Sequence, residues 1–195
     1  MKTFQELLAE NGACGAARTW AADKTIEEVV AECHRGDWLL WLAYRIGIDT
    51  RQLILPKAHC ANTVRHLMKD VRSINAVDIA IAYGEGRATD EELRKAACAA
   101  ADAAEIMCST LSSTNEEEYT SALWFAAESA SYAAYLFSYS CAIYSAQAAD
   151  SYAYHTLDAD SAANAIHKNR KQTADICREY IGQAIIERVN ELLNQ

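Results

Sequence analysis

The segment from Ala122 to Ala149 carries one formal charge, at Glu128, and consists mainly of Ala, Ser and Tyr. A helix of this composition has no charged face for water, so it suits a position surrounded by other helices. Alanine accounts for 38 of the 195 residues, whereas the chain holds one proline and seven glycines, the main helix breakers. No stretch alternates polar and apolar residues long enough for a strand. The sequence therefore predicts an all-α protein.

The starts of the expected helices are marked by a capping box. In this motif a Thr side chain accepts a hydrogen bond from a first-turn amide, and a Glu three residues later accepts one from the amide of the Thr. Asp49 is a weaker start of a similar kind, and Asp158 is expected to cap the last helix. Four pairs fit the motif: Thr3 and Glu6, Thr25 and Glu28, Thr89 and Glu92, and Thr114 and Glu117.

The ends of the helices are marked by proline and glycine. Pro56 lacks an amide hydrogen and is expected to kink or interrupt the helix around it. Gly84 and Gly86 are expected to end the next helix. The helix over 115–150 is long enough to be broken into two. The predicted helices cover residues 3–10, 25–34, 37–46, 50–69, 71–83, 89–111, 115–150 and 158–193.

Small side chains form a stripe along the helix over 89–111. They recur at spacings of three and four, so they share one face and let a neighbouring helix approach closely. The chain has no linker-like segment, and its length suits one domain. We expect residues 1–195 to form a single-domain antiparallel multi-helix bundle with tightly packed Ala-rich helices; packing across a homodimer is the alternative. The stripe comprises Leu93, Ala96, Ala97, Ala100, Ala104, Met107 and Leu111.

Charge and cysteine usage limit the partners and the compartment. The net charge of −9 argues against nucleic-acid binding, which requires clustered Lys and Arg. It permits a basic protein partner, although an acidic charge also serves solubility. The seven cysteines are spread singly without a CxxC pair, and the first ten residues lack the apolar core of a signal peptide. We therefore expect a cytoplasmic protein with free thiols.

The uncharged run from Ser129 to Ala149 is long enough to cross a bilayer. However, it holds five serines and four tyrosines against one Leu and one Ile, and membrane insertion depends on large aliphatic residues. No basic cluster flanks the run to set a topology. We therefore expect no membrane span.

Recognisable catalytic and metal-binding motifs are missing from the sequence. The histidines match no zinc spacing, and the nearest group, His59, Cys60 and His66, spreads over two helical turns. No GxSxG elbow or phosphate-binding glycine loop occurs. We therefore expect no catalytic residue, no metal, no cofactor and no enzymatic activity.

Two groups of polar side chains allow a structural and a functional interpretation. Tyr132, Tyr135 and Tyr139 share a helix face, where their rings either fill the gaps left by alanine or line a polar cavity. Arg65 and Arg72 belong to a group of arginines between residues 35 and 95 that either pair with carboxylates or bind an anion. The functional alternative is a binding pocket for an anionic small molecule between helices, with these five residues as its lining.

A tryptophan-containing motif carries a family resemblance. It consists of Gly36, Asp37, Trp38, Leu39, Leu40, Trp41 and Leu42, and it precedes an Arg-bearing helix and an Ala-rich helix after Gly86. With these features the chain resembles the immunity proteins of bacterial polymorphic-toxin systems, from about Asp23 to Ile186. Those proteins are all-helical, alanine-rich and cytoplasmic, and they neutralise a cognate toxin. The resemblance implies stoichiometric masking of a toxin without turnover.

The residues of this motif also have expected structural roles. Gly36 is expected to close the preceding helix and Asp37 to cap the next one, while Trp38, Leu39, Trp41 and Leu42 fill the core. A toxin-binding surface is expected elsewhere, on exposed acidic and aromatic groups, because nuclease-type toxins are often basic and complementary charge speeds capture. The candidate partner-binding residues are Glu116, Glu117, Glu118, Tyr119, Asp158 and Asp160.

Overall fold

The computed structural model describes the chain except residues 1, 112–116, 136–137 and 157–158. The side chains of residues 110–111, 117–120, 155–156 and 159–163 also lie outside the described part. Across the described residues the chain forms helices and no strand, which confirms the all-α prediction. The helices are α1 (Phe4–Glu10), α2 (Gly15–Trp20), α3 (Ile26–Glu32), α4 (Gly36–Arg45), α5 (Thr50–Asn62), the 3-10 helix η1 (Arg65–Leu67), α6 (Val71–Gly84), α7 (Asp90–Leu111), α8 (Glu117–Ala134), α9 (Cys141–Thr156) and α10 (Ala159–Leu193).

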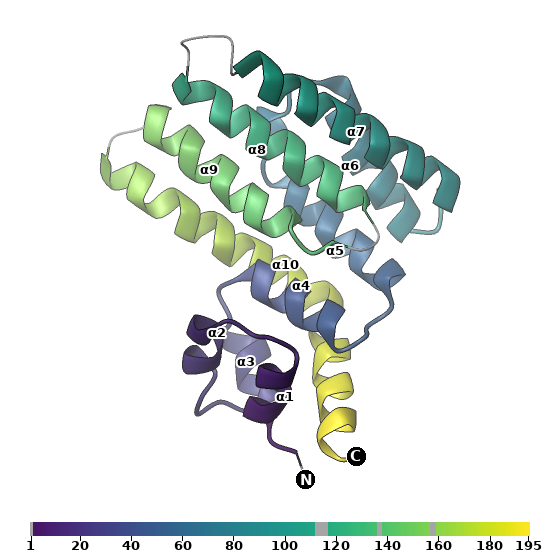
Figure 1. Cartoon of the computed structure of the whole chain (residues 1–195), viewed down its shortest axis with the longest axis vertical. Coiled ribbons are helices and arrows are strands. Elements are labelled where there is room, and N and C mark those ends of the chain that lie inside the picture. The colour runs from purple at the N-terminus through teal and green to yellow at the C-terminus, as the bar shows by residue number, and fades with distance from the viewer. Residues whose placement is uncertain (1, 112–116, 136–137, 157–158) are drawn as a thin grey trace.

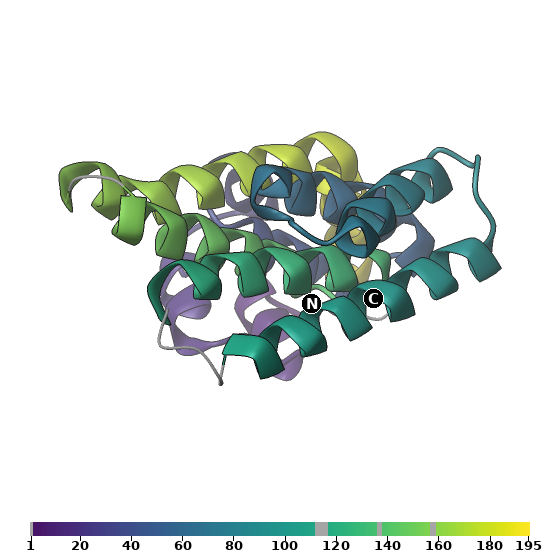
Figure 2. The same cartoon turned by 90° about the horizontal axis from the view of Figure 1, so that it is seen from above.

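The four long C-terminal helices form a layer. Helices α7, α8, α9 and α10 lie side by side in chain order, and α5 and α6 pack against them (Figure 1). Figure 2 shows α7 and α10 on opposite sides of this layer. Helix α10 extends beyond the layer, where α3 and α4 pack against it. The short helices α1, α2 and α3 form this end of the molecule, which also holds both termini (Figure 1).

Alanines allow the close packing of the layer. Ala126, Ala130 and Ala133 of α8 are fully buried in the same core as residues of α5 and α9. In α7 the predicted stripe is buried from Leu93 to Ala104. Because an alanine adds only a methyl group beyond the backbone, the helix axes approach closely and the apolar surface is removed from water. The expectation of tightly packed Ala-rich helices is therefore confirmed.

The capping boxes form where the sequence predicts them. In the boxes at Thr3 and Thr25, the Thr hydroxyl accepts from the amide of the Glu, and the Glu carboxylate accepts from the amide of the Thr. Thr89 and Glu92 make the same two bonds, of 2.8 and 3.2 Å. Asp49 accepts a hydrogen bond from the Arg51 amide at 2.9 Å. The predicted caps at Thr114 and Asp158 lie outside the described residues.

Several helix boundaries differ from the prediction. Helix α5 continues through Pro56, whose side chain is buried, so tertiary packing offsets the missing amide bond and the helix ends only at Asn62. The expected helix over 50–69 therefore divides into α5 and η1. The helix over 115–150 is broken into α8 and α9. Helix α2 was not predicted, because its first residue Gly15 follows Cys14, which makes no side-chain cap.

The role predicted for Gly36 is wrong. Helix α3 ends before Cys33, and Gly36 is instead the first residue of α4. A Cβ atom at Gly36 would lie 2.6 Å from Thr173, because α10 crosses α4 at this point. Glycine is therefore required by the close approach of two helices and not by a helix end. Asp37 does not cap α4 either, since its carboxylate pairs with Arg35 at 2.6 and 2.8 Å.

Candidate functional site

The predicted partner-binding residues lie in or beside the least described part of the chain. Glu116 and Asp158 lie outside the described residues. Glu117, Glu118 and Tyr119 belong to the first turn of α8, and Asp160 belongs to α10, but their side chains lie outside the described part. Their role in partner binding stays a prediction.

The arginines of the predicted anion pocket are paired with carboxylates. Arg65 of η1 donates two hydrogen bonds to Asp78, of 2.6 and 2.8 Å. Arg72 donates to both carboxylate oxygens of Asp70, at 3.0 and 2.7 Å, and these bonds hold the pKa of Asp70 below its usual range. Of the two interpretations of Arg65 and Arg72, the contacts support pairing with carboxylates, because each guanidinium already has its counter-ion.

The predicted tyrosine stripe divides between two locations. The Tyr139 ring packs against Tyr44 of α4, with 5.8 Å between ring centroids. Tyr132 stacks on Tyr144 of α9 with a centroid separation of 5.1 Å and an angle of 3°. Tyr132 and Tyr135 both line a cavity between α7 and α8. Neither Arg65 nor Arg72 is among the described residues that line this cavity, so the five candidates do not form one pocket.

The cavity between α7 and α8 has a volume of about 520 Å³ and combines aromatic and acidic walls. Helix α8 presents Trp124, Glu128 and Tyr132 to it, because spacings of four place these side chains on one face, and Tyr135 follows directly after the helix. Helix α7 contributes carboxylate and thiol groups. The described lining consists of Ala101, Glu105, Cys108, Trp124, Glu128, Ser131, Tyr132 and Tyr135.

Glu128 is the least usual of these groups. Its side chain is half-buried, and burial raises the pKa of its carboxyl group. Within the described part of the chain, no hydrogen bond or ion pair compensates for this burial. An uncompensated, partly buried carboxylate costs stability, so such groups are usually kept for a purpose other than packing. Sequence reasoning noted Glu128 only as the single charge of an apolar helix.

The negative charge is concentrated in one segment of the chain, which the sequence predictions did not use. No Lys or Arg lies between Lys95 and Lys168, and this segment carries nine Asp and Glu residues. The rest of the chain holds 18 acidic and 18 basic residues, so residues 96–167 account for the whole formal charge of −9. The segment covers most of α7, all of α8 and α9, and the start of α10. These elements lie away from α1, α2 and α3 (Figure 1).

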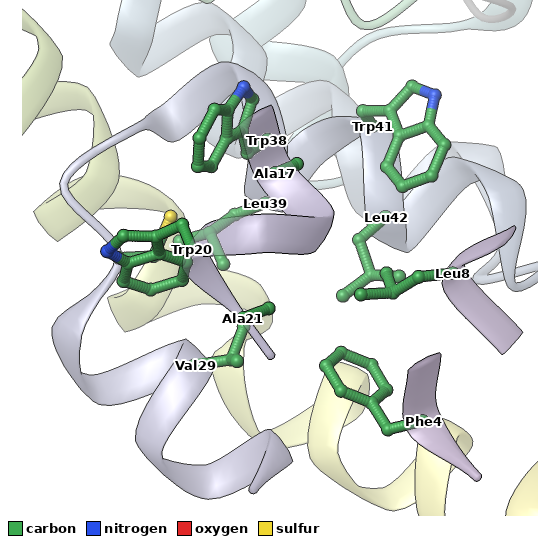
Figure 3. Close-up of a pocket in the computed structure, with 11 residues that line it drawn as sticks. Phe4, Leu8, Ala17, Trp20, Ala21, Val29, Trp38, Leu39, Trp41 and Leu42 are labelled. Carbon is green, nitrogen blue, oxygen red and sulfur yellow. The ribbon is translucent and has the colours of Figure 1, made fainter. Parts of the chain in front are cut away.

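The tryptophan-containing motif is part of the packing between α4 and the N-terminal helices. Leu39 and Leu42 are buried as predicted, whereas Trp38 and Trp41 are only half-buried. Figure 3 shows that Trp20 and Trp38 lie close together, and that Leu42 faces Leu8. The apolar cavity among these side chains has a volume of only about 30 Å³. It has room for no ligand larger than a water molecule, so these side chains pack against one another and do not line a small-molecule site.

Cations cover the exposed faces of two of these tryptophans. The guanidinium of Arg35 lies 4.9 Å from the ring centroid of Trp38, and the ammonium of Lys24 lies 5.3 Å from that of Trp20. Such cation–π contacts contribute on the order of 0.5–1 kcal/mol each at exposed sites. They also reduce the apolar surface that the rings leave open to a partner.

A buried lysine lies close to the end of α8. Lys57 of α5 is fully inaccessible to solvent, and its ammonium donates a hydrogen bond to the carbonyl oxygen of Tyr135. Tyr135 follows the last residue of α8, where the helix dipole is negative. Burial lowers the pKa of Lys57 to about 8. This contact anchors the backbone of a residue whose ring lines the cavity.

The buried thiols are packed as small apolar groups. Cys60 and Cys177 approach each other with 3.9 Å between sulfur atoms, and each also donates to a backbone carbonyl. Burial raises the pKa of Cys33 to about 11 and that of Cys141 to about 12, so both thiols are protonated at neutral pH. A protonated thiol is a poor nucleophile and a poor metal ligand.

Three histidines, His34, His59 and His66, contact aromatic rings. His59 stacks on Tyr180 with ring centroids 5.1 Å apart, and His66 meets the edge of Tyr152 at 5.9 Å. In the part of the chain that the structure describes, no three His, Cys, Asp or Glu side chains are placed to hold a metal ion.

These features define an all-α helical bundle with an acidic segment over residues 96–167 and a cavity of aromatic and acidic side chains between α7 and α8. No family model matches the chain, and neither a curated protein nor a solved structure matches it. None of the helices, over the residues described, is long and apolar enough to cross a membrane.

Proposed function

We propose that this protein is a cytoplasmic immunity protein that binds a basic toxin and masks it in a stoichiometric complex without catalysis. The observation that carries the proposal is the location of the charge: residues 96–167 hold the entire formal charge of −9. A surface of one sign attracts a partner of the opposite sign and raises the rate of association.

The acidic groups of this segment are available to a partner. Asp102, Glu105 and Asp150 are exposed, and none of them forms an ion pair among the described residues. Acidic residues elsewhere are often paired, for example Asp78 with Arg65 and Asp175 with Arg178. Unpaired carboxylates keep their full field at the surface, whereas paired ones largely cancel it.

The competing hypothesis of an anionic ligand receives no support from these contacts. Arg65 and Arg72 are already paired with aspartates, and the negative field around the α7–α8 cavity repels an anion. The acidic cavity instead agrees with a cationic partner.

The proposal is tested in the native host by affinity purification and native mass spectrometry. We expect a basic protein in a fixed ratio, whose toxicity in a separate host is abolished by co-expression of this protein. The Asp102→Lys and Glu105→Lys double variant should weaken the complex at least tenfold. Asp23→Lys with Glu179→Lys makes the same change in net charge at exposed sites outside the acidic segment, and it should weaken binding much less.

Two results would contradict the proposal. One is a partner that the two double variants bind equally well, because the acidic segment would then not be the binding surface. The other is a small anionic adduct in the mass spectrum with no protein partner. The same spectra report whether the protein is a monomer or a homodimer.

A further inference from the structure

We infer that the cavity between α7 and α8 binds an organic cation through its alkylammonium or guanidinium group. This inference does not rest on toxin masking, since the described lining of the cavity comes from this chain alone. The described lining offers three aromatic side chains, two carboxylates and a serine hydroxyl, and it contains no Lys or Arg.

The aromatic walls are held in place by neighbouring rings. Trp124 contacts Phe125 at 4.8 Å and Tyr144 at 6.3 Å between ring centroids. Tyr132 is stacked on the same Tyr144, and Tyr135 lies 6.5 Å from Tyr132. Aromatic faces attract cations through their quadrupole, and rings fixed in advance lose little entropy when a ligand binds. The cavity is therefore preorganised on its aromatic side.

The carboxylates supply the charge. Glu128 is half-buried and lacks a counter-ion within the described residues, and Glu105 lies on the opposite helix and lines the same cavity. Ser131 is only 4% exposed, and its hydroxyl makes no hydrogen bond among the described residues. A ligand with a positive charge and N–H donors would offset the cost of burying Glu128 and would also give Ser131 a partner.

Size and chemistry favour an organic cation over a metal ion. A volume of about 520 Å³ falls in the range of small-molecule sites. Ca²⁺ and Mg²⁺ require about six or more oxygen ligands in a compact shell. Aromatic rings make up much of this lining instead, and they suit a weakly hydrated cation such as a quaternary ammonium or a guanidinium.

The test is isothermal titration calorimetry on the purified full-length protein under reducing conditions. The probes are choline, n-propylguanidinium and 3,3-dimethyl-1-butanol, which is the uncharged isostere of choline. We expect the isostere to bind at least tenfold more weakly than the tighter of the two cations. Glu128→Gln and Trp124→Leu should each weaken that cation on the order of tenfold. Glu179→Gln, an equal charge change on an exposed part of α10, should leave the affinity unchanged.

The relative affinities distinguish two sources of the cation. Tighter binding of choline assigns the cavity to a free quaternary ammonium compound, and tighter binding of n-propylguanidinium assigns it to an arginine side chain of a protein. Equal binding of the isostere, no binding of either cation at 10 mM, or unchanged affinity in Glu128→Gln would overturn the inference. Because Glu128→Gln removes an uncompensated charge, it is expected to fold, and circular dichroism checks this. Loss of toxin binding with retained cation binding would overturn only the proposed function.

Discussion

The burial of Lys57 leads to a prediction about stability and pH. Its ammonium lies in the core, with the Tyr135 carbonyl as its hydrogen-bond acceptor and the Cys141 thiol as the neighbouring titratable group. Desolvation disfavours the charged form and lowers the pKa from 10.5 in the unfolded chain to about 8 in the folded protein. Between these two values the unfolded chain binds more protons than the folded protein.

The free energy of unfolding should therefore rise as the pH increases from 8 to 10.5. One pKa unit corresponds to about 1.4 kcal/mol, so Lys57 alone contributes a rise of about 3 kcal/mol over this interval. The buried thiols act in the opposite direction above pH 9. The pKa values of Cys33 and Cys141 are raised to about 11 and about 12, so the unfolded chain loses these protons first and stability falls. A single pH profile of the wild type would mix both effects.

The Lys57→Met variant separates the effect of the lysine from that of the thiols, because it keeps the thiols and replaces the lysine by an apolar side chain of similar length. Urea unfolding followed by circular dichroism at pH 7, 8, 9 and 10 gives the free energy of unfolding of both proteins. Loss of the hydrogen bond to Tyr135 shifts the variant by a nearly constant amount at every pH. The free energy of the wild type minus that of the variant should grow by about 2.5 kcal/mol between pH 7 and pH 10.

Lys69→Met, at an exposed lysine, is the control for loss of one positive charge. Its difference from the wild type should change little with pH. If the difference in free energy between the wild type and Lys57→Met also grows by less than about 0.5 kcal/mol, the reasoning is refuted. A pKa that burial lowers must make the free energy of unfolding depend on pH.

Three further predictions concern single positions. Gly36→Ala should lower the free energy of unfolding by about 1–3 kcal/mol, because its methyl group would lie 2.6 Å from Thr173. Gly15→Ala is the control and should cause no such loss, because no atom lies within 4 Å of the added methyl group. Equal losses in urea unfolding would contradict the close approach of α4 and α10. Thr25→Ala should lower the free energy of unfolding by about 1 kcal/mol, because α3 loses its cap, whereas Thr25→Ser should keep most of that stability. Thermal unfolding in which both variants match the wild type would rule out a stabilising cap. Glu128→Gln should raise the melting temperature at pH 7, because the raised pKa of Glu128 means that its charged form destabilises the folded state. This gain should disappear as the pH falls through that pKa. If differential scanning fluorimetry shows no gain at pH 7, a counter-ion must compensate the charge of Glu128.

The structure separates features that are local in the chain from those that are not. The caps at Thr3, Thr25 and Thr89 were predictable, because each joins atoms three residues apart whose geometry the helix start imposes. The fold class was predictable for a similar reason, since helix propensity and scarce breakers act residue by residue. The continuation of α5 through Pro56 was not, because it depends on what packs around that proline.

The candidate site depends on contacts between residues that are far apart in the chain. The prediction placed Tyr132 and Tyr135 on one helix face and noted Glu128 as the single charge of its segment, but it did not join them with Trp124. Nothing in the chain indicated that Tyr144 would stack on Tyr132, or that Glu105 would line the cavity with Glu128. Those pairings require the rotation and crossing of two separate helices.

The sequence by itself determined that this protein is helical, where most of its helices begin, and where its negative charge lies. Only the tertiary structure decided that Gly36 lies where α4 and α10 cross, that Lys57 is buried with its ammonium bonded to the Tyr135 carbonyl, and that Arg65 is paired with Asp78. The reason is physical. Backbone hydrogen bonds and caps involve neighbours in the chain, whereas burial, pairing and cavities depend on side chains from distant segments that meet only when the helices pack.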